Sequence, residues 1–423
     1  MKKFIIRGPT KSINGTVSIE GAKNSALPIM ASSILFKDKI IIKNIPFVKD
    51  VLTMKKLLES LGSTVQLYES KRTIIIKNPK EHKKIVSHNL VSTMRAGVLT
   101  MGPLLGRYQN KEIKTALGGG CSLGVRATNF HTDGFKSLGA QHFLKEGYVN
   151  LKSPIGLKGS TYKFPKITVT GTENLIMAAI FVNDSHILHN ISVEPEVIDL
   201  IKFLNNSGAK IKFIGRRSIK ITGIKNLING SHKIIPDRIE TFSYLAVAAI
   251  TKGKINVKNT DPSLLKSELN VLSKIGCKMK LYKDSIILQG PKNIKSINIK
   301  TGPYPNYLAT DCMPIILAVL TKSIGISRIN ETIFTNRFMS APELIRMGAK
   351  IKIRKNVATI VGVKSLSGTK CISSDLRTTF AIILGAIAAE GTGTVMRVYH
   401  GLRGYYKLDK KLKKLGINIR VAN

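Results

Sequence analysis

The chain contains no tryptophan, few aromatic residues and few acidic residues. Of its 423 residues, 6% are aromatic, and 25 Asp and Glu stand against 67 Lys and Arg, a formal net charge of +42. The basic residues are scattered, with no Arg-rich tail or dense basic block, and the aromatic signature of RNA-binding domains is missing. The charge therefore indicates a composition bias together with attraction of anionic small molecules, with nucleic acid as the less favoured alternative.

Cysteine pairs and long apolar runs are also missing. Cys121, Cys277, Cys312 and Cys371 form no CxxC pair, which argues against a disulfide framework or a zinc site and favours the reducing cytoplasm. The longest apolar run, residues 380–389, is about half of a membrane span, and the run before Arg7 is too short for a signal peptide. A chain of this length predicts two domains.

A glycine that ends a helical stretch recurs about every 70 residues, which predicts six repeats. These glycines are Gly62, Gly139, Gly208, Gly276, Gly348 and Gly416. Within the repeat that begins near Lys254, residues 255–257 alternate as a strand, and Asp261 and Pro262 are typical of a helix start. Residues 279–281 and 286–288 then predict a closing hairpin.

A second series of helices, apolar on nearly all faces, precedes these elements. They open at residues 24–27, 93–96, 171–174, 237–240, 310–313 and 375–378. Helices of this kind should be buried, so each repeat is predicted to contain a strand, a helix, a strand, a helix and two strands. Polar and basic residues at the helix starts favour a substrate with phosphates and carboxylates, although simple capping is the alternative.

A reactive site is predicted around the glycine-rich stretch Gly118 to Arg126. Its glycines allow Cys121 to lie on a mobile loop, and Arg126 would favour the thiolate. The alternative is a surface loop with an incidental cysteine. Lys23 at a helix start gains nothing from the helix dipole, so it indicates an anionic ligand. Asp311 either caps its helix or accepts a proton from a hydroxyl.

Several arginines fall in turns or at helix starts, where a surface cation or a local ion pair is the alternative to ligand binding. They are Arg95, Arg126, Arg337, Arg377 and Arg403. His186 and His189 are three residues apart without an evident third ligand, so no metal site is expected.

Six segments resemble the UDP-N-acetylglucosamine 1-carboxyvinyltransferases, a family of enolpyruvyl transferases. They are residues 21–28, 93–96, 119–126, 236–241, 331–339 and 375–377, in the family's order over essentially the whole chain. The resemblance implies an α/β fold of two inside-out barrels, each made of three βαβαββ-type repeats with the helices inside. The first domain would comprise residues 1–20 and 236–423, and the second residues 21–235 with the Cys121 loop.

The resemblance also implies the reaction. The family transfers the enolpyruvyl group of phosphoenolpyruvate to the 3-hydroxyl of UDP-N-acetylglucosamine and releases phosphate, as the committed step of peptidoglycan precursor synthesis. The expected protein is a cytoplasmic monomer whose partners are these two small molecules, with no metal, cofactor, nucleic acid or membrane. Cys121 would be the proton donor, able to add to phosphoenolpyruvate and to be alkylated by fosfomycin, and Asp311 would take the hydroxyl proton.

The family's binding residues are carried over position by position. Phosphoenolpyruvate would be held by Lys23, Asn24, Arg126, Arg377 and Arg403, of which Lys23 and Arg403 would also act in catalysis. The nucleotide sugar would be bound by Arg95, Arg126, Ala127, Thr128, Asn129, Phe130, Lys166, Ile167, Thr168, Val169, Asp311 and Ile333.

Four positions depart from the family pattern, and two other functions stay open. The departures are Gly118, Asn129, Met313 and Leu402. One alternative is the sister enzyme 3-phosphoshikimate 1-carboxyvinyltransferase, which is not expected to carry the Cys121 loop. The other is a basic nucleic-acid-binding protein on a degenerate enzyme scaffold.

Overall fold

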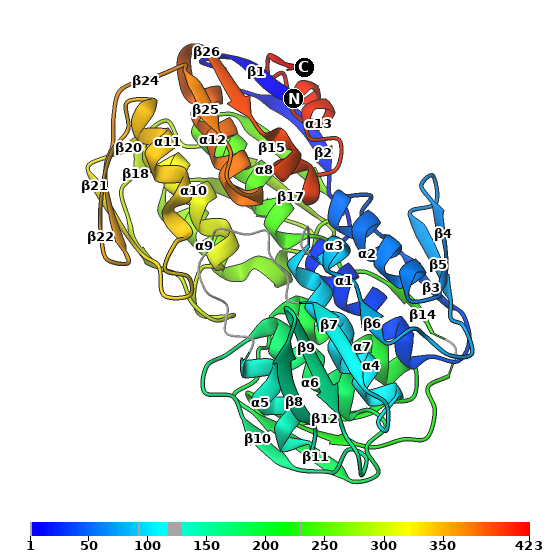
Figure 1. The fold of residues 1–423 in the computed structure, drawn as a ribbon. Coiled ribbons are helices and arrows are strands. Elements are labelled where there is room, and N and C mark those ends of the chain that lie inside the picture. The colour runs from blue at the N-terminus through cyan, green and yellow to red at the C-terminus, as the bar shows by residue number, and fades with distance from the viewer. Residues whose placement is uncertain (1, 92–93, 117–128, 229) are drawn as a thin grey trace. The chain divides into compact units, whose positions relative to one another are not determined.

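The structure, a computed structural model, describes residues 2–91, 94–116, 129–228 and 230–423. These residues form two compact units. The terminal unit combines the segment that ends at Glu20 with Pro236–Asn423, and the middle unit holds the described residues between Gly21 and Ile235. Figure 1 shows both, with the N- and C-termini in the terminal unit.

The middle unit contains three four-stranded sheets, in the orders β14-β3-β5-β4, β6-β7-β9-β8 and β10-β11-β13-β12. Its strands are β3 (Ile40–Lys43), β4 (Thr64–Tyr68), β5 (Thr73–Lys77), β6 (Ile85–Val86), β7 (Ile113–Ala116), β8 (Gln141–Lys145), β9 (Tyr148–Lys152), β10 (Thr161–Lys163), β11 (Ser185–His189), β12 (Lys210–Gly215), β13 (Ser218–Thr222) and β14 (Ser231–Lys233). Its helices are α1 (Lys23–Ser32), η1 (Ser33–Leu35), α2 (Lys49–Ser60), α3 (His88–Val91), η2 (Arg95–Thr100), α4 (Met101–Arg107), α5 (Asn129–Ser137), α6 (Val169–Ala179) and α7 (Pro195–Asn206), where η marks a 3₁₀ helix.

The terminal unit contains the sheets β16-β17-β15-β2, β19-β21-β23-β22 and β24-β26-β1-β27, in the last of which β25 also pairs with β26, and a short pair β18-β20. Its strands are β1 (Lys3–Gly8), β2 (Asn14–Ser18), β15 (Lys254–Lys258), β16 (Lys278–Leu281), β17 (Ser285–Gln289), β18 (Ile294–Lys295), β19 (Asn298–Lys300), β20 (Ser323–Ile324), β21 (Ile326–Asn330), β22 (Lys350–Arg354), β23 (Val357–Val361), β24 (Leu366–Ser367), β25 (Lys370–Ile372), β26 (Ala389–Met396) and β27 (Ile419–Ala422). Its helices are α8 (Arg238–Ile250), η3 (Pro262–Leu265), α9 (Lys266–Lys274), η4 (Thr310–Cys312), α10 (Met313–Leu320), η5 (Arg337–Ser340), α11 (Ala341–Arg346), α12 (Leu376–Ala388), η6 (Val398–Arg403) and α13 (Leu408–Lys414).

The six larger sheets share one topology. In the repeat β10-α6-β11-α7-β12-β13, the front strand β10 pairs in parallel with β11, and β12 and β13 form the antiparallel hairpin. Three repeats are completed by strands from elsewhere in the chain: β14 is the front strand beside β3, β2 is the front strand beside β15, and β1 is the last strand beside β26 and β27. Each of these three repeats therefore closes only when distant segments meet.

The predicted glycines end the second helix of every repeat. All six have positive φ, between 86° at Gly416 and 106° at Gly62. At Gly276 the glycine amide donates to the Ser273 carbonyl and the next amide, of Cys277, donates back to Leu272. The same pair of hydrogen bonds occurs at the other five glycines. This is the Schellman arrangement, in which glycine adopts the left-handed conformation without a Cβ clash.

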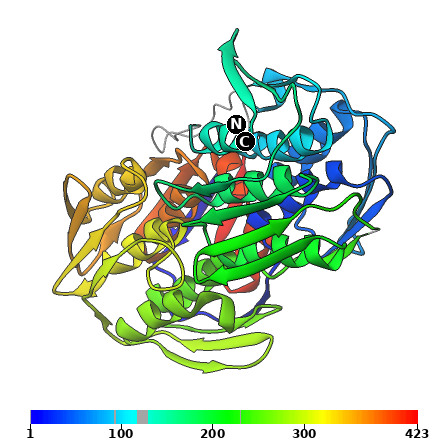
Figure 2. The same ribbon diagram turned by 90° about the horizontal axis from the view of Figure 1, so that it is seen from below.

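The first helices of the repeats are buried, as their apolar sequences predict. Every residue of α8 and of α10 is buried, and α10 packs on α12 inside the terminal unit. In the middle unit α4 packs on α6. Figure 2 shows sheets along the outer faces of the units. Together with the burial of these first helices, this confirms the predicted α/β architecture of repeats with buried helices. No helix in the described part of the chain is long and apolar enough to cross a membrane.

Several predicted helix starts are 3₁₀ turns. After Asp261, which accepts a hydrogen bond from the Ser263 amide, η3 precedes α9, and η4 likewise precedes α10. The tighter 3₁₀ turn is common at helix N-termini. Asp311 lies within the 3₁₀ turn η4.

Candidate active site

The Asp311 carboxylate forms ion pairs with two buried arginines of the terminal unit. Its Oδ1 accepts a hydrogen bond from Arg337 Nη2 at 2.7 Å, and its Oδ2 accepts from Arg377 Nε at 3.1 Å and Nη2 at 3.0 Å. The arginine side chains are 2% and 3% exposed, whereas that of Asp311 is 30% exposed. Two guanidinium groups stabilise the charged carboxylate, which still reaches solvent along one edge.

Local hydrogen bonds explain why both arginines point at Asp311. Asp375 caps α12 by accepting from the amides of Arg377 and Thr378, at 2.9 and 3.1 Å, which fixes the first turn that carries Arg377. Arg337 lies at the start of η5, and its Nε donates to the Thr310 carbonyl at 2.9 Å. Of the alternatives to ligand binding for these two arginines, a surface position is wrong because both are buried, whereas a local pair is present because each forms an ion pair with Asp311.

The charge on Arg377 is maintained by its partner. Burial acts to lower its pKa, but the Asp311 carboxylate more than offsets this, so the net shift is upward. The Arg377 guanidinium carbon lies 5.5 Å from the centre of the Tyr405 ring, and burial raises the pKa of Tyr405 to about 12. Arg377 therefore remains a cation in contact with Asp311.

The Glu331 side chain connects the following loop to the residue next to Asp311. Glu331 Oε2 accepts from Thr310 Oγ1 at 3.0 Å, while Oε1 accepts from the amides of Ile333 and Phe334 at 2.8 and 3.1 Å. This holds Ile333, whose side chain is 42% exposed, in the loop that adjoins Asp311. Of the other predicted residues in the terminal unit, Arg403 ends η6 and is partly buried.

The predicted Lys23 begins α1 in the middle unit and has a carboxylate partner. Its Nζ donates to Asp50 Oδ2 at 3.1 Å, with the two side chains 13% and 5% exposed. Asp50 lies in the first turn of α2, and the predicted Asn24 follows Lys23 on α1 and is partly buried. Asp50 thus places a cation at a helix start where the helix dipole disfavours it.

A buried polar network anchors the same helix start. Ser25 Oγ donates to Asp199 Oδ2, which also accepts from the amide of Ile235 at 3.3 Å. His232 Nε2 lies 2.8 Å from Asp199 Oδ1. Asp199, 2% exposed on α7, therefore joins α1 to β14 and to the end of the middle unit.

The predicted nucleotide-sugar residues of the middle unit lie mostly at helix starts. Lys166 is exposed, and residues 167–169 are partly buried where the chain enters α6, with Thr168 Oγ1 accepting from the Gly171 amide at 3.2 Å. Asn129 and Phe130 begin α5, and Arg95 begins η2. Cys121, Arg126, Ala127 and Thr128 lie outside the described residues.

Comparisons with known proteins agree over the full length of the chain. Residues 8–412 match the family model described as EPSP synthase (3-phosphoshikimate 1-carboxyvinyltransferase). UDP-N-acetylglucosamine 1-carboxyvinyltransferase from Pelagibacter ubique (strain HTCC1062) is 43% identical over 423 residues, which is 100% of both chains. The protein of the same name from Magnetococcus marinus is 40% identical and covers 99% of each chain. The chain belongs to the UDP-N-acetylglucosamine 1-carboxyvinyltransferase family.

Solved structures share the fold of this family member at low sequence identity. The enolpyruvyl transferase NikO from Streptomyces tendae superposes with a TM-score of 0.89 at 19% identity, over 100% of this chain and 99% of that one. EPSP synthase from Acinetobacter baumannii gives a TM-score of 0.77 at 16% identity over 100% of both. At these identities the likeness shows the fold alone.

The described cysteines of this carboxyvinyltransferase family member are all buried and free. Burial raises the pKa of Cys277 and of Cys371 to about 12, and burial raises that of Cys312 well above its ordinary value. A thiol is a nucleophile only as the thiolate. Among these three cysteines, none is therefore suited to react at neutral pH.

The two histidines considered for a metal site have other partners. His186 Nδ1 lies 3.1 Å from Ser160 Oγ, and burial lowers the His186 pKa to about 4. His189 Nδ1 lies 2.8 Å from Ser218 Oγ. Across the described ranges, no three His, Cys, Asp or Glu side chains form a group that could hold a metal ion.

Sequence reasoning did not single out Asp50, Asp199 or Glu331 as individual site residues. Asp50 carried a weak signal, an acidic residue in the first turn of an amphipathic helix. Asp199 and its partner His232 are separated by 33 residues, and neither belongs to a recognisable motif. Their role arises from contacts that only the folded chain brings together.

Proposed function

We propose that this protein transfers the enolpyruvyl group of phosphoenolpyruvate to the 3-hydroxyl of UDP-N-acetylglucosamine, with release of phosphate, as the committed step of peptidoglycan precursor synthesis. Identity of 43% over the full length to a protein named for this reaction carries the proposal. We further propose that the two compact units are the two domains of the family fold.

The proposed chemistry is an addition followed by an elimination. The Cys121 thiol gives its proton to the methylene carbon of phosphoenolpyruvate, and the sugar oxygen bonds to the adjacent carbon as its proton passes to Asp311. The bond to phosphate then breaks, with phosphate taking the bonding electrons, and the new methyl group returns a proton to the Cys121 thiolate, which restores the double bond. If the Cys121 sulfur, in place of the sugar oxygen, bonds to the carbon that carries the phosphate, a covalent adduct forms.

The arginine pairing of Asp311 bears on its proposed role. A carboxylate stabilised by Arg337 and Arg377 at 2.7 and 3.0 Å is a weak base. A sugar hydroxyl becomes acidic only as its oxygen bonds to carbon, so a weak base suffices at that moment. The arrangement supports a role in which Asp311 first orients the hydroxyl as a hydrogen-bond acceptor and then takes its proton.

The anionic substrate would be held by charge. Lys23, Arg126 and Arg403 are proposed to bind the phosphate and carboxylate of phosphoenolpyruvate, with Asn24 orienting it and Arg377 supporting. Charge-assisted clamps of this kind position reactants and stabilise developing charge. The Lys23–Asp50 and Asp311–Arg377 pairs support this by presenting cations in fixed positions.

The nucleotide sugar would be bound by the carried-over positions around α5, α6 and Ile333. Thr168 supports this because its side chain caps α6 and fixes the segment from Lys166 to Val169. Of the departures from the family pattern, Asn129 is itself one of these positions, and Met313 stands two residues after Asp311 in the sequence. Met313 is fully buried in α10. Its side chain therefore packs in the core, where an apolar residue is suited.

The decisive test is phosphate release from phosphoenolpyruvate with either acceptor. We expect turnover with UDP-N-acetylglucosamine and none with shikimate 3-phosphate. Turnover with shikimate 3-phosphate alone would assign the sister reaction. No turnover with either, together with salt-sensitive binding of nucleic acid, would support the basic binding protein.

The role of Cys121 has a separate test. Cys121→Ala should abolish turnover and block alkylation by fosfomycin, whereas Cys312→Ala should retain both because that thiol is buried and un-ionised. Alkylation that persists in Cys121→Ala would place the reactive thiol elsewhere. We also propose a cytoplasmic monomer, supported for the compartment by the three free cysteines; size-exclusion chromatography with light scattering tests the monomer.

A further inference from the structure

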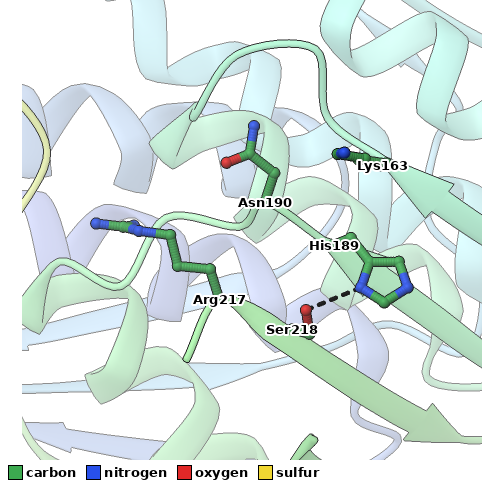
Figure 3. A pocket seen from close by; sticks show the side chains of 5 residues that line it. All are labelled: Lys163, His189, Asn190, Arg217 and Ser218. Atoms are coloured by element: carbon green, nitrogen blue, oxygen red, sulfur yellow. Dashed lines mark hydrogen bonds between the residues drawn. The ribbon is translucent and has the colours of Figure 1, made fainter. Parts of the chain in front are cut away.

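A basic pocket lies in the middle unit, and none of the residues that line it was predicted to bind a substrate. It has a volume of about 560 Å³ and is lined by Lys163, His189, Asn190, Arg217 and Ser218 (Figure 3). The lining includes two cationic side chains and an imidazole, and none of the five residues is acidic. A hollow with this composition attracts anions.

The sheet topology assembles the pocket at one end of β10, β11 and β13. Lys163 pairs with His189 in the parallel register, and His189 pairs with Ser218 in the antiparallel register. Arg217 precedes β13, and Asn190 follows β11 with a φ of 56°. Three strands therefore hold these residues side by side, and backbone hydrogen bonds fix their positions.

The side chains are oriented by specific contacts. Arg217 Nη1 donates to the Ile191 carbonyl at 3.0 Å, and Asn190 Nδ2 donates to the Phe164 carbonyl at 2.8 Å. The Ser218 hydroxyl, 2.8 Å from His189 Nδ1, can donate to that nitrogen, which leaves Nε2 as a donor. Figure 3 shows the Arg217 guanidinium and the Lys163 ammonium on either side of Asn190 in this view.

The charges around Arg217 favour an added anion. Burial lowers the Arg217 pKa, Glu194 acts to raise it, and the neighbouring Arg216 acts to lower it again. Glu194 therefore offsets part of the positive charge, and the net shift is still downward. An anion in the pocket would stabilise the Arg217 cation against its partial burial and against Arg216.

We propose that this pocket binds a phosphate-bearing small molecule, with Lys163 and Arg217 contacting its anionic oxygens and His189 as a further donor. Arg is suited to phosphate because its planar fork makes paired charge-assisted hydrogen bonds. The absence of any stacking aromatic among the five lining residues favours a compact anion over a nucleic-acid strand. Two separated cations suit a diphosphate better than a single phosphate.

The pocket adjoins the segment that leads to the predicted nucleotide-sugar residues. The Phe164 amide donates to the His189 carbonyl at 3.1 Å, and Asn190 holds the Phe164 carbonyl. Phe164 stands just before Lys166–Val169, so the diphosphate bound here has two possible sources. It belongs either to the nucleotide sugar itself, which rests on the proposed function, or to a separate phosphorylated compound.

The test is calorimetric titration of the full chain with pyrophosphate at fixed ionic strength. Lys163→Gln/Arg217→Gln should weaken binding at least about tenfold, the loss expected when charge-assisted contacts are removed. The matched control is Lys212→Gln/Lys220→Gln, which removes the same charge from an exposed pair on β12 and β13 of the same sheet. The control should bind as the unaltered chain does.

A repeat of the titration with saturating UDP-N-acetylglucosamine identifies the source. Competition assigns the pocket to the nucleotide sugar's diphosphate, and undiminished pyrophosphate binding assigns it to a separate compound. Equal affinity in the unaltered chain, the pocket variant and the control would overturn the proposal, whether or not the protein proves to be a carboxyvinyltransferase. Lys163→Gln alone, on a strand held by backbone hydrogen bonds, serves if Arg217→Gln disturbs folding.

Discussion

Removal of the Asp311 carboxylate should destabilise the terminal unit strongly, because two arginines depend on it. Asp311→Ala leaves the guanidinium groups of Arg337 and Arg377, 2% and 3% exposed, without the anion that they share. Removing one partner of a buried ion pair costs about 3–5 kcal/mol. We expect the lower end, about 3 kcal/mol, since water can enter beside a side chain that is 30% exposed and Arg337 keeps its bond to Thr310.

Two further substitutions separate charge from shape. Asp311→Asn keeps a hydrogen-bond acceptor of the same size, so it should cost about 1.5–3 kcal/mol, as charged hydrogen bonds do. Arg337→Met removes one buried cation and leaves Asp311 paired with Arg377 at 3.0 Å. Its cost should therefore be smaller than that of Asp311→Ala.

The assay is native-state hydrogen exchange at the amides of α10 and α12, which reports the local free energy of opening. This is preferable to a single unfolding curve because a chain with two compact units need not unfold in one step. The control is Asp284→Ala, an exposed aspartate between β16 and β17, which should change the free energy by less than about 0.5 kcal/mol. If Asp311→Ala matches that control, or if Arg337→Met proves the costlier change, the account of the site as a shared ion pair is wrong.

Three other predictions concern buried polar groups and helix ends. Asp199→Asn replaces the charged acceptor shared by Ser25 and His232. We expect the free energy of unfolding to fall by about 2 kcal/mol and the KM for phosphoenolpyruvate to rise in the phosphate-release assay. An unchanged KM would show that Asp199 does not help to position Lys23. Glu173→Gln should stabilise the protein increasingly as the pH rises above 4.5, because burial, then Glu196 and Glu194, raise the Glu173 pKa from that value. The folded state then holds a proton that the unfolded chain has lost, so stability falls with pH in the unaltered protein, and urea midpoints that differ equally at acid and neutral pH would contradict this. Gly348→Ala, with φ of 96° and open space around the added Cβ, should cost about 1 kcal/mol of backbone strain. Gly276→Ala should cost more, since its Cβ would also lie 3.2 Å from Pro291 Cβ, and equal thermal shifts would show that this contact relaxes freely.

The repeats and their helix ends could be predicted because their signals are local. A glycine that follows an amphipathic helix needs only its own conformational freedom to form the left-handed cap, and all six do so. Asp261, Asp237 and Asp375 likewise cap the helix that they precede. The burial of α8, α10 and α12 follows from their apolar composition alone.

The candidate site could be predicted only in part. Lys23, Asp311 and Arg377 were singled out through their places at helix starts and through a family resemblance. Arg337 was named only as a candidate binding arginine, with a surface cation or a local ion pair as the alternative. Whether an arginine points outward or into the core depends on which carboxylate the fold brings to it. Asp311, the partner that both arginines share, lies 26 residues from Arg337 and 66 residues from Arg377 in the sequence.

The amino-acid sequence by itself determined the repeat, the glycine caps and the apolar helices, since each depends on residues within one or two turns of the chain. The tertiary structure alone decided that β1, β2 and β14 complete repeats that begin elsewhere, that two arginines share Asp311, and that Asp199 joins α1 to β14. It also gathered Lys163, His189 and Arg217 around one pocket. Such contacts form only when segments distant in sequence are packed together, and no local pattern encodes them.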